Sequence, residues 1–266
     1  MKGARATPRL VFGSSVAAGD RVLPEEVAVA LSFNGTTQAV MMATPSDLED
    51  FGFGFALTEG IAKSDEILSV EVETVPRGRD VQVWLKPEAE ERLAARRRTM
   101  SGPVGCGLCG IDSIEQALRQ VPVVQPSSFQ MTPSQVQAAV AALPGEQRLH
   151  DATRAVHGAA FWNGRILIAR EDVGRHNALD KLVGGMLRQG VGAEGAVVLT
   201  SRVSTDMVQK VAMLGAPMII AVSAPTAEAV ELAERAGITL VALARGDRFE
   251  VFSHTDRILT EGAHVG

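Results

Sequence analysis

Residues 196–243, AVVLTSRVSTDMVQKVAMLGAPMIIAVSAPTAEAVELAERAGITLVAL, alternate short apolar runs with segments of helical periodicity. The predicted strands are 196–199, 218–222 and 238–243, and the predicted helices are about 204–214 and 226–236. Strands that alternate with helices are joined by right-handed crossovers and form a parallel sheet covered by helices. This stretch therefore predicts an α/β fold with a mainly parallel sheet.

The same domain extends toward the N-terminus. A helix is predicted at about 133–143, and Asn163-Gly164 predicts the turn of a β-hairpin. A further helix over 174–188 carries Leu179, Leu182, Val183 and Met186 on one face. We assign residues 133–266 to this α/β domain.

The first 110 residues have a different pattern. Apolar runs at 27–33 and 38–43 flank Asn34-Gly35, a strong hairpin signal, and further strands are predicted at about 66–75 and 80–85. Ser46 and Glu49 have the spacing of a capping box for a helix that reaches about Glu59, and another helix is predicted at 88–98. These features predict a smaller N-terminal α+β domain over 1–110. Residues 111–132, a short helix and a segment rich in proline and serine, are the predicted linker.

Composition excludes several classes of protein. The chain has 26 Lys and Arg against 31 Asp and Glu, a net charge of −5, which argues against general binding of nucleic acid. No apolar run approaches the ~18 residues of a membrane span, and segment 10–18 is too short and too interrupted for a secretory signal. Two closely spaced cysteines are a poor disulfide framework. We expect a cytoplasmic protein with no membrane or nucleic-acid partner.

The two cysteines, Cys106 and Cys109, lie in the segment GCGLCG at 105–110. Such a pair serves as half of a zinc site, as a thiol–disulfide couple, or as a nucleophilic thiolate that carries a group on its sulfur. Zinc is disfavoured, because a second cysteine pair is missing and the histidines lack metal-ligand spacing. A helix predicted just after Cys109 would stabilise a thiolate through its N-terminal amides. We predict an exposed nucleophilic loop with Cys106 and Cys109 as catalytic residues and no structural metal, against a buried, inert pair.

Polar residues follow each predicted parallel strand. Ligands of open α/β sheets bind at the carboxyl ends of the strands, where hydroxyls, helix N-terminal amides and arginines bind phosphate. The candidate ligand-binding residues are Ser201, Arg202, Ser223, Leu243, Ala244, Arg245, Gly246, Asp247 and Arg248. They predict an anion-binding rim for a phosphate-bearing ligand. Taken singly, Ser204 and Thr226 are better explained as helix caps than as ligand-binding residues.

Two histidines are ambiguous. His176 lies four residues before Asp180, which fits either a general-base pair or a polar helix face. His157 precedes the apolar run 159–162 and fits either a catalytic role or a hydrogen-bonded histidine of the core.

Five segments together resemble the formate dehydrogenase accessory sulfurtransferase family, the FdhD/NarQ family. They are CGLCG at 106–110, EDVGRHNALDK at 171–181, TSRVS at 200–204 with VQK at 208–210, VSAPT at 222–226 and LARGDRF at 243–249. The resemblance runs in matching order from about residue 25 to 254. The block at 171–181 is highly specific, whereas the cysteine motif alone is not.

The resemblance implies a sulfurtransferase that takes persulfide sulfur from a cysteine desulfurase onto Cys106. The sulfur then passes to a molybdenum or tungsten bis-pyranopterin guanine dinucleotide cofactor, before that cofactor enters the formate dehydrogenase apoenzyme. The family's cofactor-binding stretch falls on residues 243–248, where a guanine nucleotide is also expected to bind. A cytidine deaminase-like C-terminal domain without the zinc site, and a homodimer, are further implications. A non-enzymatic cofactor chaperone, or a thiol–disulfide oxidoreductase using Cys106 and Cys109, are the alternatives.

Overall fold

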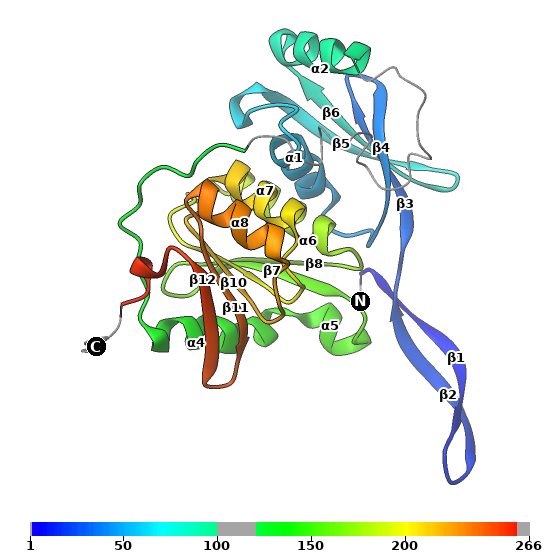
Figure 1. The fold of residues 1–266 in the computed structure, drawn as a ribbon. Helices are drawn as coiled ribbons and strands as arrows, with labels where there is room; N and C mark the ends of the chain where they lie inside the picture. Colours follow the sequence, from blue (N-terminus) through cyan, green and yellow to red (C-terminus); the bar gives the residue numbers. More distant parts are fainter. Residues whose placement is uncertain (1, 100–120, 260–266) are drawn as a thin grey trace, which may run out of the picture.

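The computed structural model describes residues 2–99 and 121–259, which form two packed units and a projecting hairpin (Figure 1). The N-terminal strands are β1 (Ala4–Phe12), β2 (Val16–Pro24), β3 (Val27–Phe33), β4 (Thr36–Ala43), β5 (Ile67–Val75) and β6 (Gly78–Leu85). The C-terminal strands are β7 (His157–Trp162), β8 (Ile166–Asp172), β9 (Ala196–Leu199), β10 (Met218–Ala221), β11 (Thr239–Arg245) and β12 (Arg248–Ser253). The α-helices of these ranges are α1 (Leu48–Thr58), α2 (Pro87–Thr99), α4 (Pro133–Ala142), α5 (Arg148–Thr153), α6 (Arg175–Arg188), α7 (Thr205–Leu214) and α8 (Ala227–Ala236). None of the helices in the described ranges is long and apolar enough to cross a membrane.

The N-terminal unit is a four-stranded sheet in the order β4-β3-β6-β5. Alternate residues of its two central strands point into one core and are at most 1% exposed: Val29, Leu31, Phe33, Val81 and Val83. Helices α1 and α2 add their apolar side chains to this core. The predicted hairpin is present, because Asn34 and Gly35 have φ angles of 47° and 78°, as a two-residue type I′ turn requires.

The start of helix α1 differs from the prediction. Asp47 occupies the N-cap position with a left-handed φ of 52°, and its side chain makes no capping hydrogen bond. The predicted capping box of Ser46 and Glu49 does not form, because the Glu49 carboxylate is paired with Arg188 of α6 instead. The ion pair between Glu49 and Arg188 therefore takes the place of the predicted capping hydrogen bonds at the start of α1.

The C-terminal unit is a six-stranded sheet in the order β12-β11-β10-β9-β7-β8. β9, β10 and β11 pair in parallel as predicted, whereas β12 and the β7–β8 hairpin are antiparallel to their neighbours. The sheet is therefore mixed rather than mainly parallel, because strands joined by a hairpin run in opposite directions. β12 is not predicted from the sequence; a turn at Gly246-Asp247, where Gly246 has φ 58°, folds it back onto β11.

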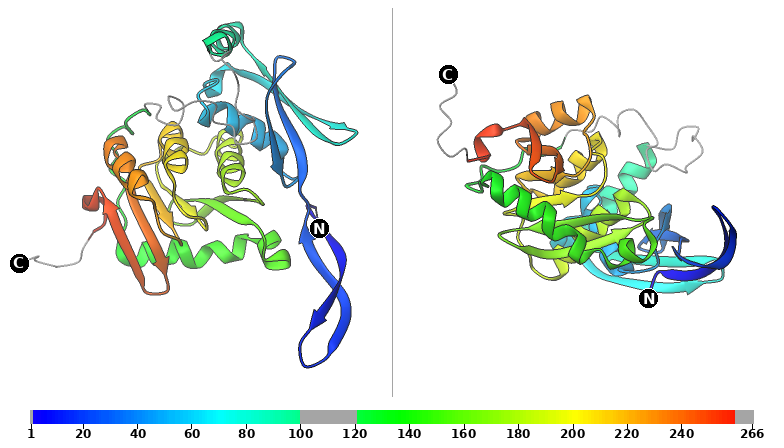
Figure 2. Two further views of the ribbon diagram at one scale, coloured as in Figure 1. Left: turned by 45° about the vertical axis from the view of Figure 1, so that its right-hand side comes forward. Right: turned by 90° about the horizontal axis from the view of Figure 1, so that it is seen from below.

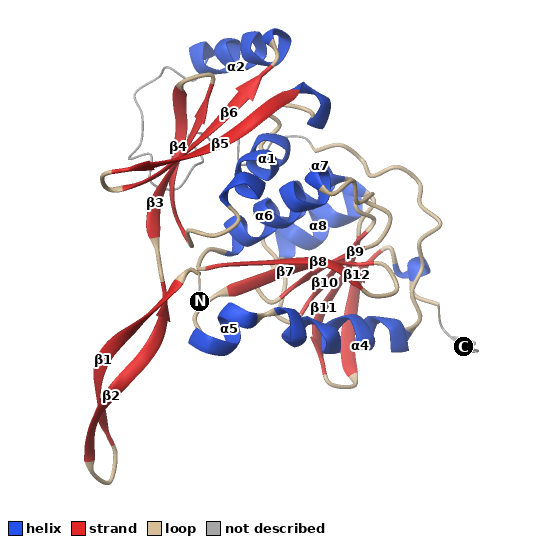
Figure 3. Cartoon of the chain, turned by 180° about the vertical axis from the view of Figure 1, so that it is seen from behind, coloured by secondary structure: helices blue, strands red, loops and turns tan. Residues whose placement is uncertain are grey.

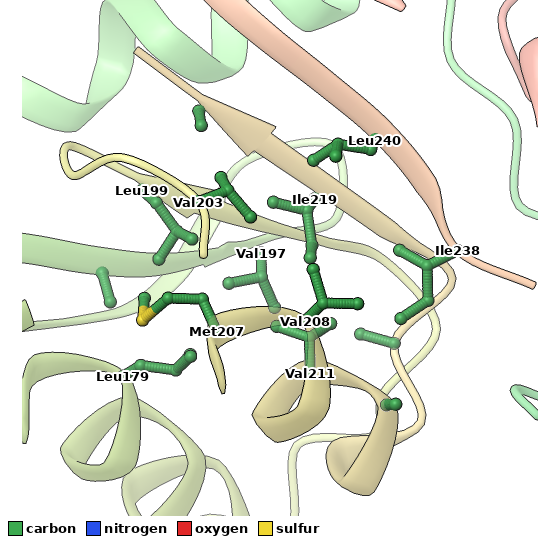
Figure 4. Packing of buried hydrophobic residues seen from close by; sticks show 14 of the residues in the cluster. Leu179, Val197, Leu199, Val203, Met207, Val208, Val211, Ile219, Ile238 and Leu240 are labelled. Carbon is green, nitrogen blue, oxygen red and sulfur yellow. The ribbon is translucent and has the colours of Figure 1, made fainter. Parts of the chain in front are cut away.

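Helices cover both faces of this sheet. α6, α7 and α8 lie on one face, and α4 and α5 lie on the other (Figures 1 and 3). On the first face, Val197, Leu199 and Ile219 of the strands pack with Leu179 and Met207 of the helices (Figure 4). The alternation of side chains along the strands thus supplies two cores, one under each helical layer.

The two units meet where α1 crosses α6. A Cβ atom built on Gly54 would lie 1.7 Å from the carbonyl oxygen of Asp180, and one built on Gly184 would lie 1.8 Å from that of Asp50. The helix backbones are in direct contact, so a side chain at either position would push them apart. This crossing fixes the N-terminal unit against the helical face of the C-terminal sheet.

Strands β1 and β2 form an antiparallel hairpin, here called the arm (residues 4–24), that projects from the body (Figures 1 and 2). The arm is not predicted from the sequence. Its strands are long, at nine residues each, yet neither contains a buried residue. It is anchored at its base, where a guanidinium nitrogen of Arg21 donates to the carbonyl of Thr153.

Candidate functional site at the carboxyl edge of the sheet

The carboxyl ends of β9, β10 and β11 lie side by side at one edge of the six-stranded sheet. The Val222 amide donates to the Leu199 carbonyl at 3.0 Å, and the Leu243 amide donates to the Ser223 carbonyl at 3.2 Å. β7 runs antiparallel to β9, so its first residue, His157, reaches the same edge. The carboxyl edge therefore contains the ends of β9, β10 and β11 together with the start of β7.

Ser201, Arg202 and Ser223 lie at this edge, as predicted from the strand ends. Ser201 is buried, and its hydroxyl donates to the Arg202 carbonyl at 3.0 Å. Ser223 is half-buried, and the Arg202 side chain is exposed. Within the described residues, only the guanidinium of Arg202 is thus free to reach outward from this loop.

Residues 243–248 span the end of β11, the turn at Gly246-Asp247 and the start of β12. Arg245 Nε donates to the Val222 carbonyl at 2.9 Å, which keeps this side chain at the edge. Arg248 is instead paired with Glu250 of β12 at 2.6 Å. The turn places the two arginines directly opposite each other, at the end of β11 and the start of β12.

The other residues of this turn have structural roles. Ala244 is 2% exposed and packs in the core on the α4 side. Gly246 adopts a left-handed φ of 58°, and the Asp247 carbonyl accepts a hydrogen bond from the Gln137 side chain of α4. Of this stretch, Arg245 offers the side chain best suited to a phosphate at the edge.

A basic cluster of His157, Arg175 and His176 lies at the same edge. His157 begins β7 opposite Asp172, while Arg175 and His176 open helix α6. The His176 imidazole contacts the carboxylate of Asp206 in the first turn of α7. Arg175 Nε is buried and has no hydrogen-bond acceptor in the part of the chain that the structure describes. The sequence drew attention to both histidines and, as part of the segment that follows β8, to Arg175, but it gave no signal for Asp206.

The charges of this cluster shift two pKa values. Burial, with the nearby charges of Arg175 and His176, lowers the pKa of His157 below its ordinary value. Burial alone would raise the pKa of Asp206, but the hydrogen bond and charge of His176 outweigh it and lower that pKa. His157 is therefore neutral near pH 7, and Asp206 is a carboxylate.

The pairing of His176 with Asp180 considered from the sequence does not form. Asp180 is 2% exposed, and its carboxylate accepts hydrogen bonds from Thr58 at 2.6 Å and from Lys210 at 2.9 Å. Burial would lower the pKa of Lys210, but the carboxylates of Asp180 and Glu59 outweigh it and raise that pKa. A buried carboxylate is stabilised by a cation, so Asp180 pairs with Lys210 of α7 rather than with His176, its neighbour on α6.

A second buried ion pair lies within the C-terminal unit and is hydrogen-bonded to Thr44 of the N-terminal unit. Lys181 Nζ donates to Asp172 at 2.5 Å and to the Thr44 carbonyl at 2.8 Å. The Thr44 amide donates to the same carboxylate at 3.0 Å. Much of the specific block at 171–181 therefore holds the units together, and its Arg175 and His176 are left to face the edge.

Cys106 and Cys109 lie outside the described residues, as does the helix predicted after Cys109. The chain leaves the N-terminal unit at the end of α2 and is described again from Val121. There the Val124 amide donates to the Ala236 carbonyl at the end of α8, at 2.8 Å. The cysteine segment thus connects the N-terminal unit to the helical face of the C-terminal unit.

The FdhD/NarQ family model matches residues 24–259. The chain belongs to the FdhD/NarQ family. It is 56% identical over 247 residues to the sulfur carrier protein FdhD of Agrobacterium fabrum (strain C58), with 91% of each chain covered. It is 53% identical over 243 residues to the sulfur carrier protein FdhD of Brucella abortus biovar 1, with 90% of each covered. The fold is similar to the crystal structure of a "putative formate dehydrogenase accessory protein" from Desulfotalea psychrophila, with a TM-score of 0.77 and 28% identity over 96% of this chain and 99% of that one.

The FdhD/NarQ family model covers the parts of the chain that carry the candidate site. It includes both cysteines, the carboxyl edge and the buried ion pairs between the units. It begins at residue 24, so that it leaves out nearly the whole arm.

Proposed function

We propose that this FdhD/NarQ protein is a sulfur carrier for formate dehydrogenase. It accepts persulfide sulfur from a cysteine desulfurase on Cys106 and transfers it to a molybdenum or tungsten bis-pyranopterin guanine dinucleotide cofactor, before the cofactor enters the apoenzyme. The observation that carries the proposal is that the only two thiols of the chain lie in one glycine-flanked segment. The names of the similar sulfur carrier proteins support it.

Loading Cys106 is an exchange between sulfur atoms. The Cys106 thiolate attacks the outer sulfur of the desulfurase persulfide, so that one S–S bond forms, another breaks, and the desulfurase thiolate leaves. In the second step the outer sulfur passes to the metal of the cofactor, which is the substrate. Cys106 departs as a thiolate, and the metal supplies the two electrons that reduce the sulfur to sulfide. Cys109 has the lesser role of resolving or positioning the persulfide.

The nucleotide end of the cofactor is proposed to bind at the carboxyl edge. Helices α6 and α7 both begin there, and helix N-termini favour phosphate. The buried Arg175 Nε, the exposed Arg202 and the edge-facing Arg245 supply the donors that a pyrophosphate requires. Arg248 lies opposite Arg245 and is proposed to add a further donor, although its guanidinium also pairs with Glu250.

Three further properties belong to the same proposal. A persulfide carrier requires reduced thiols, which places the protein in the cytoplasm. The C-terminal unit is assigned a cytidine deaminase-like fold without a zinc site, in which the mixed sheet carries helices on both faces. The working protein is a homodimer.

Complementation of a strain that lacks this gene tests the proposal. Wild type should restore client formate dehydrogenase activity, Cys106→Ala should restore none, and Cys109→Ala should retain part of it. Matched protein levels and unchanged thermal unfolding serve as controls for folding. Full activity with Cys106→Ala would contradict the carrier and favour a cofactor-binding chaperone, and equal loss in both variants would favour a thiol–disulfide oxidoreductase.

A further inference from the structure

The tip of the arm, residues 10–18, is apolar on both sides of the ribbon. Its sequence, LVFGSSVAA, contains no charged side chain. Leu10, Phe12 and Val16 are 61%, 76% and 62% exposed, and Val11 on the opposite side of the ribbon is 42% exposed. The tip lies farther from the body than the rest of the arm (Figures 1 and 3). It is thus a contiguous apolar surface in contact with water, which is typical of an interaction site.

Charged side chains begin directly behind this tip, and most of them are basic. Arg9 immediately precedes the tip, Asp20 and Arg21 follow it after one glycine, and Arg5 lies nearer the base. The three arginines are exposed and share one side of the ribbon, whereas Asp20, the single acidic residue of the arm, lies on the other side. The arm therefore has a charge-free tip with a basic band, Arg5, Arg9 and Arg21, behind it.

This order of side chains fits the surface of an anionic membrane. A segment bound at the interface of a bilayer buries apolar side chains about 5–10 Å deep and keeps basic side chains among the headgroups. The three residues from Leu10 to Phe12 span ~10 Å at ~3.3 Å per residue, which matches that depth. Long arginine side chains extend to the level of the headgroups from either side of the ribbon. A protein that packed on one side alone would leave Val11 or Phe12 in water.

The length of the arm keeps the acidic body away from such a membrane. Residues 2–24 contain four basic side chains and one acidic side chain, a net charge of +3, whereas the remainder contains 22 basic and 30 acidic side chains, a net charge of −8. An anionic surface therefore attracts the arm and repels the body. The nine-residue strands of the arm span ~30 Å at ~3.3 Å per residue. This is about three times the Debye length of ~8–10 Å, so the repulsion of the body is screened.

We propose that the arm inserts its tip into the interface of a membrane that contains anionic phospholipid, with Arg9 and Arg21 among the headgroups. The arm thereby holds the protein at the membrane surface. From the sequence we expected no membrane partner, because no apolar run is long enough to span a bilayer; contact with the surface needs no such run. The inference does not depend on the sulfur-carrier proposal, because the arm lies almost wholly outside the family match.

Co-sedimentation of the full chain with lipid vesicles tests this contact. The vesicles consist of phosphatidylcholine alone or of phosphatidylcholine mixed with phosphatidylserine. Wild type should bind the mixed vesicles about tenfold or more tightly than the neutral ones, because each basic residue near an anionic surface contributes about fivefold in affinity. Added salt should weaken this binding. A wild-type protein that does not bind the mixed vesicles, or that binds both kinds equally, would overturn the proposal.

Two exposed valines provide a matched pair of variants for the tip. Val16→Asp should weaken binding to the mixed vesicles about tenfold or more, because the inserted tip would have to desolvate a carboxylate. Val40→Asp makes the same change on β4 at a residue that is 53% exposed, against 62% for Val16, and should bind like wild type. Unchanged circular dichroism and thermal unfolding serve as controls for folding. Equal binding by the two variants would contradict insertion of the tip. So would a Val16→Asp protein whose only defect is weaker self-association without lipid, since the tip would then contact a second copy.

A second matched pair tests the basic band. Arg9→Glu should weaken binding to the mixed vesicles about tenfold or more and leave binding to the neutral vesicles unchanged, because it replaces an attraction to the headgroups by a repulsion. Arg165→Glu is the control, since Arg165 is exposed in the turn between β7 and β8, far from the arm in sequence. It should bind like wild type. If both variants lost the same affinity, the net charge of the protein rather than the arm would govern binding, and the assignment to the arm would be wrong.

A fluorescent reporter measures insertion directly. Phe12→Trp places an indole at the tip, and its emission, taken as the difference from wild type with its two tryptophans, should shift to shorter wavelength with the mixed vesicles. Val40→Trp on the body should show no such shift. A Phe12→Trp protein that sediments with the mixed vesicles while its emission stays unchanged would show that another surface makes the contact, and would refute the proposal.

Discussion

Arg175 is the residue of the carboxyl edge with the clearest need for a ligand, since its buried Nε lacks an acceptor among the described residues. We predict that Arg175→Ala weakens binding of a guanine nucleotide by about tenfold or more, because a charge-assisted hydrogen bond contributes about 1.5–3 kcal/mol. Isothermal titration calorimetry measures this directly. Arg165→Ala is the control and should bind like wild type, because Arg165 is exposed in the turn between β7 and β8, at the opposite end of β7 from His157. Equal affinities for all three proteins would place the nucleotide elsewhere.

His157 should titrate below the ordinary range of a histidine. Burial is the main cause, and the positive charges of Arg175 and His176 add to it. The pKa is lower in the folded than in the unfolded chain, so protonation favours unfolding and this contribution to stability is lost as pH falls below the unfolded pKa. An NMR titration of the imidazole should show the low midpoint, and Arg175→Ala should raise it. A midpoint in the ordinary range, or one that ignores Arg175→Ala, would contradict the assignment.

For individual residues, the sequence predicted where side chains lie better than it predicted which groups they contact. Ser201 and Ser223 lie at the edge where the strand pattern placed them. Arg245 and Arg248 lie opposite each other at the turn between β11 and β12, and β12 itself is a strand that the sequence did not predict. His176 pairs with Asp206, which is 30 residues away in sequence and visible only once β9 is placed beside β7.

At the crossing of α1 and α6, we predict that a glycine-to-alanine substitution destabilises the protein, which is the opposite of what helix propensity favours. Alanine is about 1 kcal/mol better than glycine inside a helix, yet Gly54→Ala should lower the free energy of unfolding by roughly 1–3 kcal/mol or more. The added Cβ would meet the Asp180 carbonyl oxygen at 1.7 Å, and backbone cannot move aside as a side chain can. Urea denaturation measures the difference.

Gly192→Ala provides the control for this substitution, because a Cβ atom there meets nothing within 4 Å. It should leave the free energy of unfolding close to that of wild type. If Gly54→Ala were as stable as wild type, the close contact between the two helices would be wrong.

Periodicity predicted most elements, with ends that differ from the structure by one or two residues. It predicted β9, β10 and β11 because each is a short apolar run between two helices. It did not predict β12, where polar and apolar residues alternate behind a tight turn, or the arm, whose strands contact little that is buried. Strands that depend on a partner outside the core leave a weak pattern in the sequence.

Over the whole molecule, buried charges bind the two units into one body. Lys210 reaches from α7 to Asp180, with Thr58 and Glu59 of the N-terminal unit beside it. Separating the units would break the ion pair of Lys210 with Glu59 and the hydrogen bond from Thr58 to Asp180, so the units are not expected to separate during sulfur transfer. The sequence could not reveal this joint, because Thr58 and Lys210 are 152 residues apart.

Under the proposed function, the two packed units support two reactive places, the cysteine segment and the carboxyl edge. The cysteine segment leaves one unit and returns to the other, and the carboxyl edge lies on the second. We infer that sulfur is loaded on the segment and delivered at the edge. Loading should then need neither the nucleotide nor the arginines that bind it.

The most direct test of the carrier is the mass of the protein after incubation with a cysteine desulfurase and cysteine. We predict a gain of one sulfur atom, located on Cys106 by peptide mapping, removed by a thiol reductant, and retained in Cys109→Ala. Cys106→Ala should gain none, and Arg175→Ala should gain as much as wild type. A wild-type protein that gains no sulfur, or gains it on Cys109 alone, would contradict the proposal that Cys106 carries sulfur.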